Sequence, residues 1–174
     1  MMKRLISSAA MLVFLAGCAT TGPHMSEIKD KIPPLDPNQG RIFFYRDASA
    51  FGVAVTADIM VDHKVVGRSV RGSFFFVDAA PGMHEIEVAT ELGYVTPILM
   101  AAGTTHYVES FPMPGALWGH IRAVERGVQG WLTASGELAY IGAPFDIMSS
   151  TATTSNTGGD PSNMPGIAVP KETD

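Results

Sequence analysis

Short β-prone runs separated by glycine and proline fill the middle of this chain, from about residue 41 to residue 148. Residues 54–61 alternate between apolar and polar side chains, and residues 84–90 do the same, which is the period of a half-buried strand. Further runs lie at 41–46, 65–67, 73–78, 94–100, 104–110, 121–125 and 137–141. Many short strands with turn residues between them predict an all-β fold, an antiparallel sandwich or barrel.

One of these runs is apolar on both faces. Phe74, Phe75 and Phe76 follow one another, and successive side chains of a strand point to opposite faces of its sheet. Phe75 therefore packs either between two sheets or under a covering segment such as the region of Trp131. Residues 127–135 could form a helical turn. Pro97 favours an edge position for the run 94–100, because proline cannot donate to a strand ladder.

The first eighteen residues have the pattern of a cleaved leader. Lys3 and Arg4 precede an apolar stretch at 5–16, which is too short for a bilayer core of about 30 Å that needs about 20 residues. The stretch ends in Leu-Ala-Gly-Cys at 15–18, which resembles the lipobox of bacterial lipoproteins. The resemblance implies that residues 1–17 are removed and that Cys18 is S-lipidated. The alternative is an ordinary secretory leader that happens to contain Cys18.

Cys18 is the only cysteine among the 174 residues, which excludes an internal disulfide, a thiolate zinc site and a cysteine-ligated cluster. Two or more acyl chains suffice for stable membrane anchoring. Ala19 stands where an aspartate favours inner-membrane retention in such lipoproteins, so the resemblance implies the periplasmic face of the outer membrane. Loss of Lys3 and Arg4 leaves 10 of the 12 basic residues beside 17 acidic ones, a formal charge of −7. We therefore expect no nucleic-acid partner, and the lipid rather than charge would hold the protein.

The flanks of the β-rich region differ from it in composition. Residues 18–40 contain several prolines and glycines and predict a lipidated tether of about 25 Å, with one or two helical turns at 26–32. The alternative is that this segment packs onto the domain. Residues 149–174 have few large apolar side chains and predict a disordered tail. The foldable domain is thus expected at 41–148.

The order of motifs through this domain resembles domain-of-unknown-function family 2846 of bacterial lipoproteins. The resemblance rests on Val-Asp-His-Lys-Val-Val-Gly at 61–67, with His63 where a glycine is common, and on Ala-Pro-Gly-Met-His-Glu-Ile at 80–86. PEGA-type and transthyretin-like modules are similar more loosely. The resemblance covers roughly residues 40–125 and implies a small antiparallel β-sandwich (Ig-like or transthyretin-like) in the cell envelope. It implies no reaction and no catalytic residue.

The sequence contains no recognisable catalytic or metal motif. Its five histidines include no His-x-x-x-His pair, and neither a Gly-x-Ser-x-Gly elbow nor a phosphate-binding loop occurs. His84 and His106 lie in neighbouring expected strands and could come close, but further ligands cannot be placed there. We therefore expect no enzyme, no cofactor and no metal. If a site is assembled only by the fold, Asp58, His84 and His106 are its first candidates.

The apolar, turn-rich segment 111–119 is the candidate contact patch, with Phe111, Met113, Leu117 and Trp118 as its large side chains. The alternative is that this loop closes one end of the core. We expect an envelope lipoprotein whose non-catalytic sandwich binds or scaffolds another envelope component, a protein or a glycan. The alternatives are a carrier of small apolar ligands, with the phenylalanine-rich strand lining a barrel, and an enzyme with a fold-assembled site.

Overall fold

The computed structural model describes residues 20–49, 52, 54–90, 93–114 and 120–143. The expected leader at 1–17, Cys18 and the expected tail at 149–174 lie outside the described residues. The chain divides into two compact units, Met1–Gly142 and Ala143–Asp174, and every element below belongs to the first. Among the described residues, no helix is long and apolar enough to cross a membrane.

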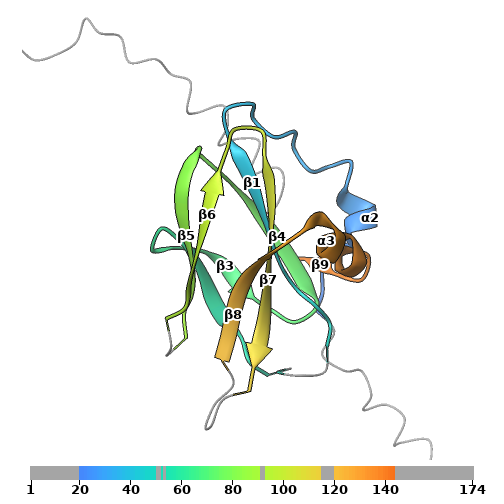
Figure 1. Cartoon of the computed structure of the whole chain (residues 1–174). Helices are drawn as coiled ribbons and strands as arrows, with labels where there is room; N and C mark the ends of the chain where they lie inside the picture. Colours follow the sequence, from blue (N-terminus) through green and yellow to red (C-terminus); the bar gives the residue numbers. More distant parts are fainter. Residues whose placement is uncertain (1–19, 50–51, 53, 91–92, 115–119, 144–174) are drawn as a thin grey trace, which may run out of the picture. The chain divides into compact units, whose positions relative to one another are not determined.

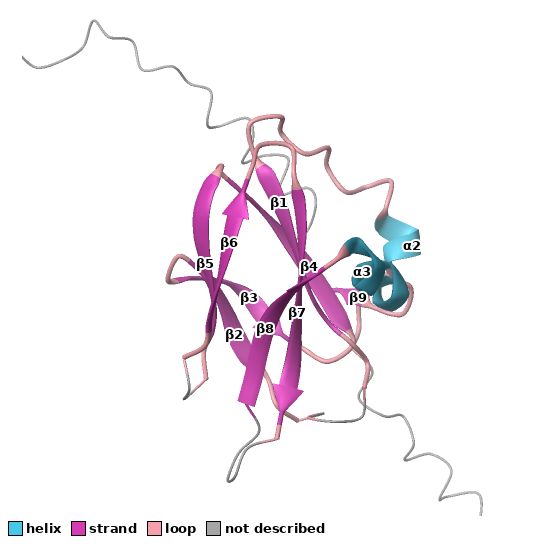
Figure 2. Cartoon of the chain, viewed as in Figure 1, coloured by secondary structure: helices cyan, strands magenta, loops and turns pink. Residues whose placement is uncertain are grey.

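Two β-sheets pack face to face as a sandwich (Figures 1 and 2). The first has the strand order β8-β7-β1-β4-β9, with strands at Gly40–Arg46 (β1), Ser73–Ala79 (β4), Thr105–Met113 (β7), His120–Arg126 (β8) and Ala139–Tyr140 (β9). The second has the order β3-β2-β5-β6, with strands at Ala57–Val61 (β2), Lys64–Ser69 (β3), Gly82–Val88 (β5) and Val95–Met100 (β6). The predicted β-sandwich is confirmed.

The pairing is antiparallel except at two places. β1 pairs with β4 in antiparallel fashion but with β7 in parallel, and β4 pairs in parallel with the short strand β9. The parallel pair arises because the chain visits the second sheet through β5 and β6 before β7 returns beside β1. β6, which contains Pro97, is an edge strand as predicted.

The two central strands of the first sheet are buried on both faces. All seven residues of β1 are buried, and so are the first four of β4. Phe44 and Phe75 stack at 5.1 Å between ring centroids, and Ile59 of the second sheet lies against them. Phe75 therefore packs between the sheets. Gly67 on β3 makes this approach possible, because a Cβ atom there would lie 2.5 Å from the Phe75 ring.

Trp131 covers the opposite face of the first sheet. It projects from the helix Val128–Ser135 (α3), which forms where a helical turn was possible from the sequence. Its ring lies 4.9 Å from that of Phe43, 5.4 Å from Phe74 and 5.6 Å from Tyr107. Alternate side chains of β1 and β4 thus belong to two separate apolar layers, one between the sheets and one beneath α3.

The segment before β1 also packs against the first sheet. The Tyr140 backbone N–H donates to the Pro23 carbonyl at 2.8 Å, and His24 forms an isolated β-bridge with Ala139. Residues Met25–Ile28 form the one-turn helix α2, whose Ile28 is only 1% exposed. The packed alternative therefore holds for residues 20–39, rather than a free tether, because the segment continues the pairing at the otherwise open β9 edge.

Arg41 ties the same segment to the sheet. Its guanidinium makes two hydrogen bonds to the carboxylate of Asp78, at 2.6 and 2.7 Å, and donates a third to the Pro33 carbonyl at 2.9 Å. It also lies 4.5 Å from the centre of the Phe76 ring. A planar guanidinium suits this combination of a bidentate carboxylate contact and aromatic stacking.

Trp131→Ala should lower the free energy of unfolding by about 3–5 kcal/mol, because it removes an aromatic side chain packed against several rings. Leu132→Ala is the matched control on the same helix, since Leu132 is 59% exposed, and it should change stability by less than about 0.5 kcal/mol. Urea denaturation followed by circular dichroism measures both. Equal losses in the two variants would contradict a core role for Trp131.

Candidate functional site

The outer face of the second sheet exposes several large aliphatic side chains. Val65, Met83, Val95 and Leu99 are 62%, 62%, 48% and 70% exposed, and we call these four residues the outer stripe. Met83 lies directly opposite Leu99 on neighbouring strands. Alternation explains the placement, because the intervening Ile86, Val88, Ile98 and Met100 point into the sandwich and are buried.

Charged side chains share this face with the outer stripe. Asp58 and Arg68 form an ion pair at 3.0 Å on the adjacent strands β2 and β3. The Nδ1 atom of His63 lies 2.5 Å from a carboxylate oxygen of Glu87, which is directly opposite Val95. The outer face thus carries exposed aliphatic side chains among charged and polar ones.

His63, Glu85 and Glu87 bring three ligand atoms within 4.8 Å of one another. Imidazole and carboxylate groups are of the right type for a divalent transition metal. His63 and Glu85 are exposed, however, and exposed acidic groups commonly cluster without a metal. The described residues offer no second feature that points to a cation here.

A hydrogen-bonded turn joins β2 to β3 beside this cluster. Asp62 and His63 have φ angles of 50° and 63°, as the two central residues of a tight hairpin turn require. One carboxylate oxygen of Asp62 accepts from the Glu85 backbone N–H at 3.0 Å, and the other lies 2.7 Å from Nδ1 of His84. Nε2 of His84 lies 2.7 Å from the Ala80 carbonyl. Because both ring nitrogens face acceptors, the doubly protonated imidazolium fits this site best.

The titration of this pair follows from the same contacts. The hydrogen bond to the Ala80 carbonyl raises the pKa of His84, and the bond to Asp62 raises it further. The pKa of Asp62 is lowered by the Glu85 backbone N–H and then by His84. Both shifts favour the charged forms of the two side chains. The ion pair between Asp62 and His84, which we call the ionic brace, therefore holds the turn against β5.

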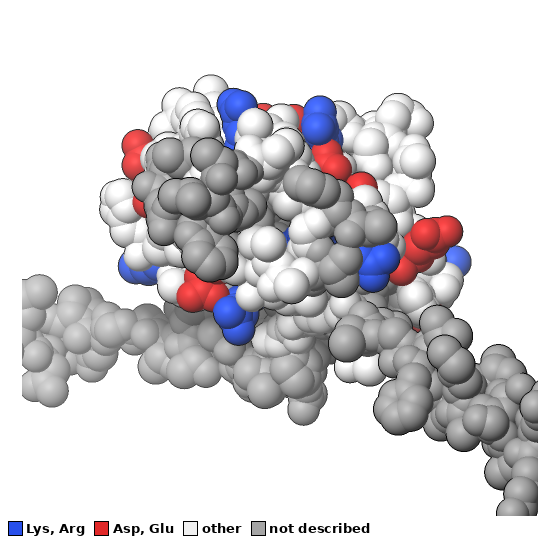
Figure 3. All heavy atoms as spheres, turned by 90° about the horizontal axis from the view of Figure 1, so that it is seen from below, with Lys and Arg blue, Asp and Glu red and all other residues white. Residues whose placement is uncertain are grey.

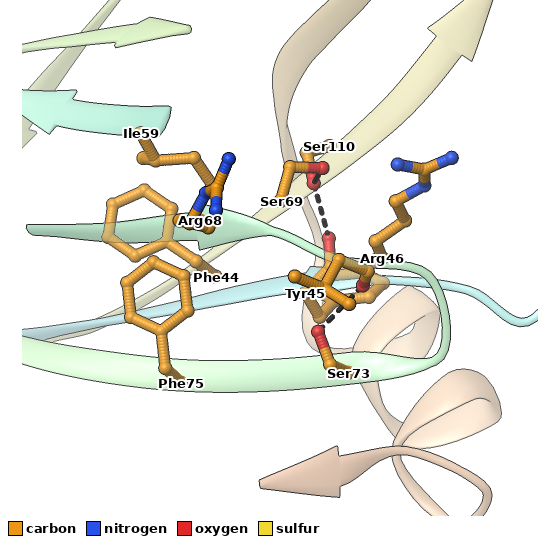
Figure 4. Close-up of a pocket in the computed structure, with 10 residues that line it drawn as sticks. Phe44, Tyr45, Arg46, Ile59, Arg68, Ser69, Ser73, Phe75 and Ser110 are labelled. Atoms are coloured by element: carbon orange, nitrogen blue, oxygen red, sulfur yellow. Dashed lines mark hydrogen bonds between the residues drawn. The ribbon is translucent and has the colours of Figure 1, made fainter. Parts of the chain in front are cut away.

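Polar groups between the sheets hydrogen-bond to one another and to the backbone. The hydroxyls of Ser69 and Ser110 lie 2.8 Å apart and link the two sheets, and Ser110 donates to the Tyr45 carbonyl at 3.2 Å (Figure 4). Together with Phe44 and Phe75 they surround a space that does not admit a water-sized sphere. The interior at this point is therefore filled by the protein's own side chains.

Arg46 is a buried cation that the sequence did not single out. It is 1% exposed, and its guanidinium donates to the carbonyls of Gly52 and Val55 at 2.5 Å each. Burial lowers the pKa of this guanidinium, chiefly by removing its hydration. Since its acceptors are neutral carbonyls, Arg46 holds Gly52 and Val55 against the end of the sandwich.

A shallow groove of about 450 Å³ lies where α3 meets the first sheet. Its size falls within the range of small-molecule sites, roughly 300–1,000 Å³. It is lined by Tyr45, Asp47, Glu109, Arg126, Gly130, Thr133 and Ala134. Arg126 and Glu109 form an ion pair at 2.7 Å within the lining, so its basic group is already paired.

The predicted contact patch is only partly within the described residues. Leu117 and Trp118 lie outside them, and Phe111 and Met113 are half-buried residues of β7. The loop prediction is wrong for these two positions, because β7 continues through Pro112 and pairs with β8 up to Met113. Among the described residues, large exposed aliphatic side chains lie instead in the outer stripe and, as Val128 and Leu132, on α3.

The three candidates for a fold-assembled site do not come together. The expectation that His84 and His106 occupy neighbouring strands is wrong, because β5 and β7 belong to different sheets. His106 lies 2.6 Å from a carboxylate oxygen of Glu125, His84 bonds to Asp62, and Asp58 pairs with Arg68. Each is engaged by a different partner.

Comparison with known proteins gives a family match over part of the chain. Residues 36–115 match the family described as "Protein of unknown function (DUF2846)", which supports the resemblance seen in the motifs. The matched region contains β1 to β7, and thus the whole second sheet, and it ends before β8 and α3. No curated protein and no solved structure matches the chain.

Stability should depend on pH through His84. Folding raises the pKa of His84. Its contribution to the free energy of unfolding is therefore full below the ordinary histidine pKa of about 6.5, and is lost as the pH rises through the higher pKa of the folded state. Asp62 acts oppositely, and its contribution is lost only in acid, below the ordinary aspartate range. His84→Gln should therefore cost more stability at pH 5.5 than at pH 8.5. Urea titrations of both proteins at the two pH values measure this, and a pH-independent difference would contradict the ionic brace.

Proposed function

We propose that this chain is a lipid-anchored envelope lipoprotein whose non-catalytic β-sandwich binds another component of the envelope. The anchor would be Cys18, lipidated after removal of residues 1–17, and the location the periplasmic face of the outer membrane. The observation that carries the binding role is the outer stripe, with four large aliphatic side chains at least 48% exposed on one sheet face. Three of the four, Met83, Val95 and Leu99, lie on the paired strands β5 and β6, and an exposed apolar patch marks an interaction site in soluble domains.

The character of the outer stripe favours a protein partner over a glycan. Its four side chains are aliphatic and offer no aromatic ring on which a sugar could stack. Each square ångström of apolar surface removed from water contributes about 25 cal/mol, so a matching apolar patch supplies the attraction. The Asp58–Arg68 pair and Glu85 on the same face would set orientation and exclude poorly matched surfaces.

The alternative functions receive less support. A carrier of apolar ligands needs a cavity, whereas the space around Phe44, Phe75 and Ile59 is filled. A fold-assembled enzyme based on Asp58, His84 and His106 would need these groups to converge, and each is paired elsewhere. The groove beside α3 has the size of a ligand site, but its arginine is paired with Glu109.

The binding proposal predicts that Leu99→Glu abolishes partner capture. A buried carboxylate opposite Met83 would be costly to desolvate in any complex formed through the outer stripe. Crosslinking in intact cells, followed by identification of the products, measures the effect, and we expect at least a tenfold loss of the specific product. Leu132→Glu is the matched control, because Leu132 is also well exposed, at 59%, and lies on α3, away from the outer stripe. Products unchanged in Leu99→Glu, or lost equally in both variants, would contradict the proposal.

The anchor proposal predicts that Cys18→Ser abolishes lipid attachment. Radiolabelled palmitate should be incorporated into the wild-type protein and not into the variant, because the variant has no thiol for the thioether bond. The variant should also leave the membrane fraction. Palmitate label persisting in Cys18→Ser would rule out Cys18 as the attachment point.

A further inference from the structure

Thr20, the first described residue, lies two positions after Cys18 and already contacts the sandwich. The hydroxyl of Thr20 donates to the Arg71 carbonyl. Two residues later, Gly22 lies so close to the Tyr140 carbonyl that no Cβ atom would fit. The Pro23 carbonyl then accepts from Tyr140, as described above. The chain is therefore held to the domain from residue 20 onward.

This fixation limits how far a lipid on Cys18 can lie from the domain. Consecutive Cα atoms are 3.8 Å apart, so the Cα atom of Cys18 lies within about 8 Å of that of Thr20. The reach of about 25 Å expected for a free tether is not available, because residues 20–39 pack against the first sheet.

Thr20 lies at one end of the sandwich, which we call the basal end. Here β1 ends at Arg46 opposite Ser73, where β4 begins, and β7 ends at Met113 opposite His120, where β8 begins. These strand ends lie at the bottom of Figure 1. Arg71 belongs to the same end, since its guanidinium donates to the carbonyls of Ala48 and Ser49 just after β1.

We infer that the basal end rests on the lipid surface, with the strands of the sandwich standing away from the bilayer. The inference rests on the proposed lipidation of Cys18 and goes beyond it, because an anchor alone does not fix which part of a domain faces the membrane. Thr20 supplies that information through its contact with Arg71.

The composition of the basal end suits a lipid headgroup layer. Seen from below, charged side chains lie mainly toward its margin, and the described residues near its middle are mainly uncharged (Figure 3). Ala54, Tyr94 and Pro114 are exposed here. The Arg122 guanidinium lies 5.3 Å from the centre of the Tyr94 ring. Tyrosine and arginine together are typical of membrane interfaces, where one part of the side chain is apolar and the other is wet.

Two fluorophore positions test the orientation. Ala54→Cys lies at the basal end and Ala102→Cys in the β6–β7 turn at the opposite end, and both alanines are exposed. Since Cys18 carries lipid, each variant has a single free thiol. The lipidated full-length variants are labelled and reconstituted into vesicles of phosphatidylethanolamine and phosphatidylglycerol with nitroxide-headgroup lipids. The nine residues of β7 span about 30 Å, so we expect at least threefold stronger quenching at position 54 than at 102.

Flotation of the same vesicles distinguishes a failure of the lipid anchor from a failure of the proposed orientation. Protein that fails to float with the vesicles overturns the lipid anchor itself. Protein that floats but is quenched equally at both positions, or more strongly at 102, overturns the orientation and leaves the anchor standing.

A second variant tests whether the packing of the segment after Cys18 sets the orientation. Gly22→Val cannot fit against the Tyr140 carbonyl and should detach the first residues, so the domain gains reach and the quenching difference shrinks at least twofold. Gly136→Val is the matched control, because a Cβ atom there meets no neighbour within 4 Å. Circular dichroism confirms that both remain folded. An unchanged difference in folded Gly22→Val would overturn the role assigned to the packed segment.

Discussion

Burial of β1 and β4 on both faces is the constraint on which the rest of the structure depends. A strand with apolar side chains in both directions needs two covers. The second sheet supplies one, through Ile59 and its neighbours against Phe44 and Phe75. Trp131 and the segment 20–39 supply the other. The segment before β1 is thus part of the domain, and its fixation follows from the same need to cover the first sheet.

Local patterns in the sequence were enough to predict the strands and the layered fold, but not the partners of each strand. Phe74 to Phe76 indicated burial on two faces, and Pro97 indicated an edge. The parallel pairing of β1 with β7 joins residues about sixty positions apart, and no local pattern records which strand lies beside which. The buried position of Arg46 could not be predicted for a related reason. Its hydrogen-bond acceptors are backbone carbonyls, which every residue possesses, so no sequence motif marks them.

The contact surface was harder to predict than the fold because exposure depends on strand order. Phe111 and Met113 were assigned to a loop, since the prolines at 112 and 114 are typical turn residues. β7 instead runs through Pro112 and half-buries both side chains. In the second sheet the alternation of 84–90 correctly separated Ile86 from Glu85. Only the pairing of β5 with β6 brings Leu99 opposite Met83 and so places exposed residues of two separate strands side by side.

The two proposed surfaces are compatible because they lie in different directions on one rigid body. The basal end is formed by strand ends, whereas the outer stripe lies along the side of the sheet formed by β3, β2, β5 and β6. A sandwich standing on its basal end would therefore present Met83 and Leu99 sideways, roughly parallel to the bilayer. A partner held at the same membrane meets that face during lateral diffusion, which raises its effective concentration without any new contact. If Cys18 carries the lipid as proposed, the short connection from Thr20 would strengthen the effect, because it would keep the basal end close to the bilayer.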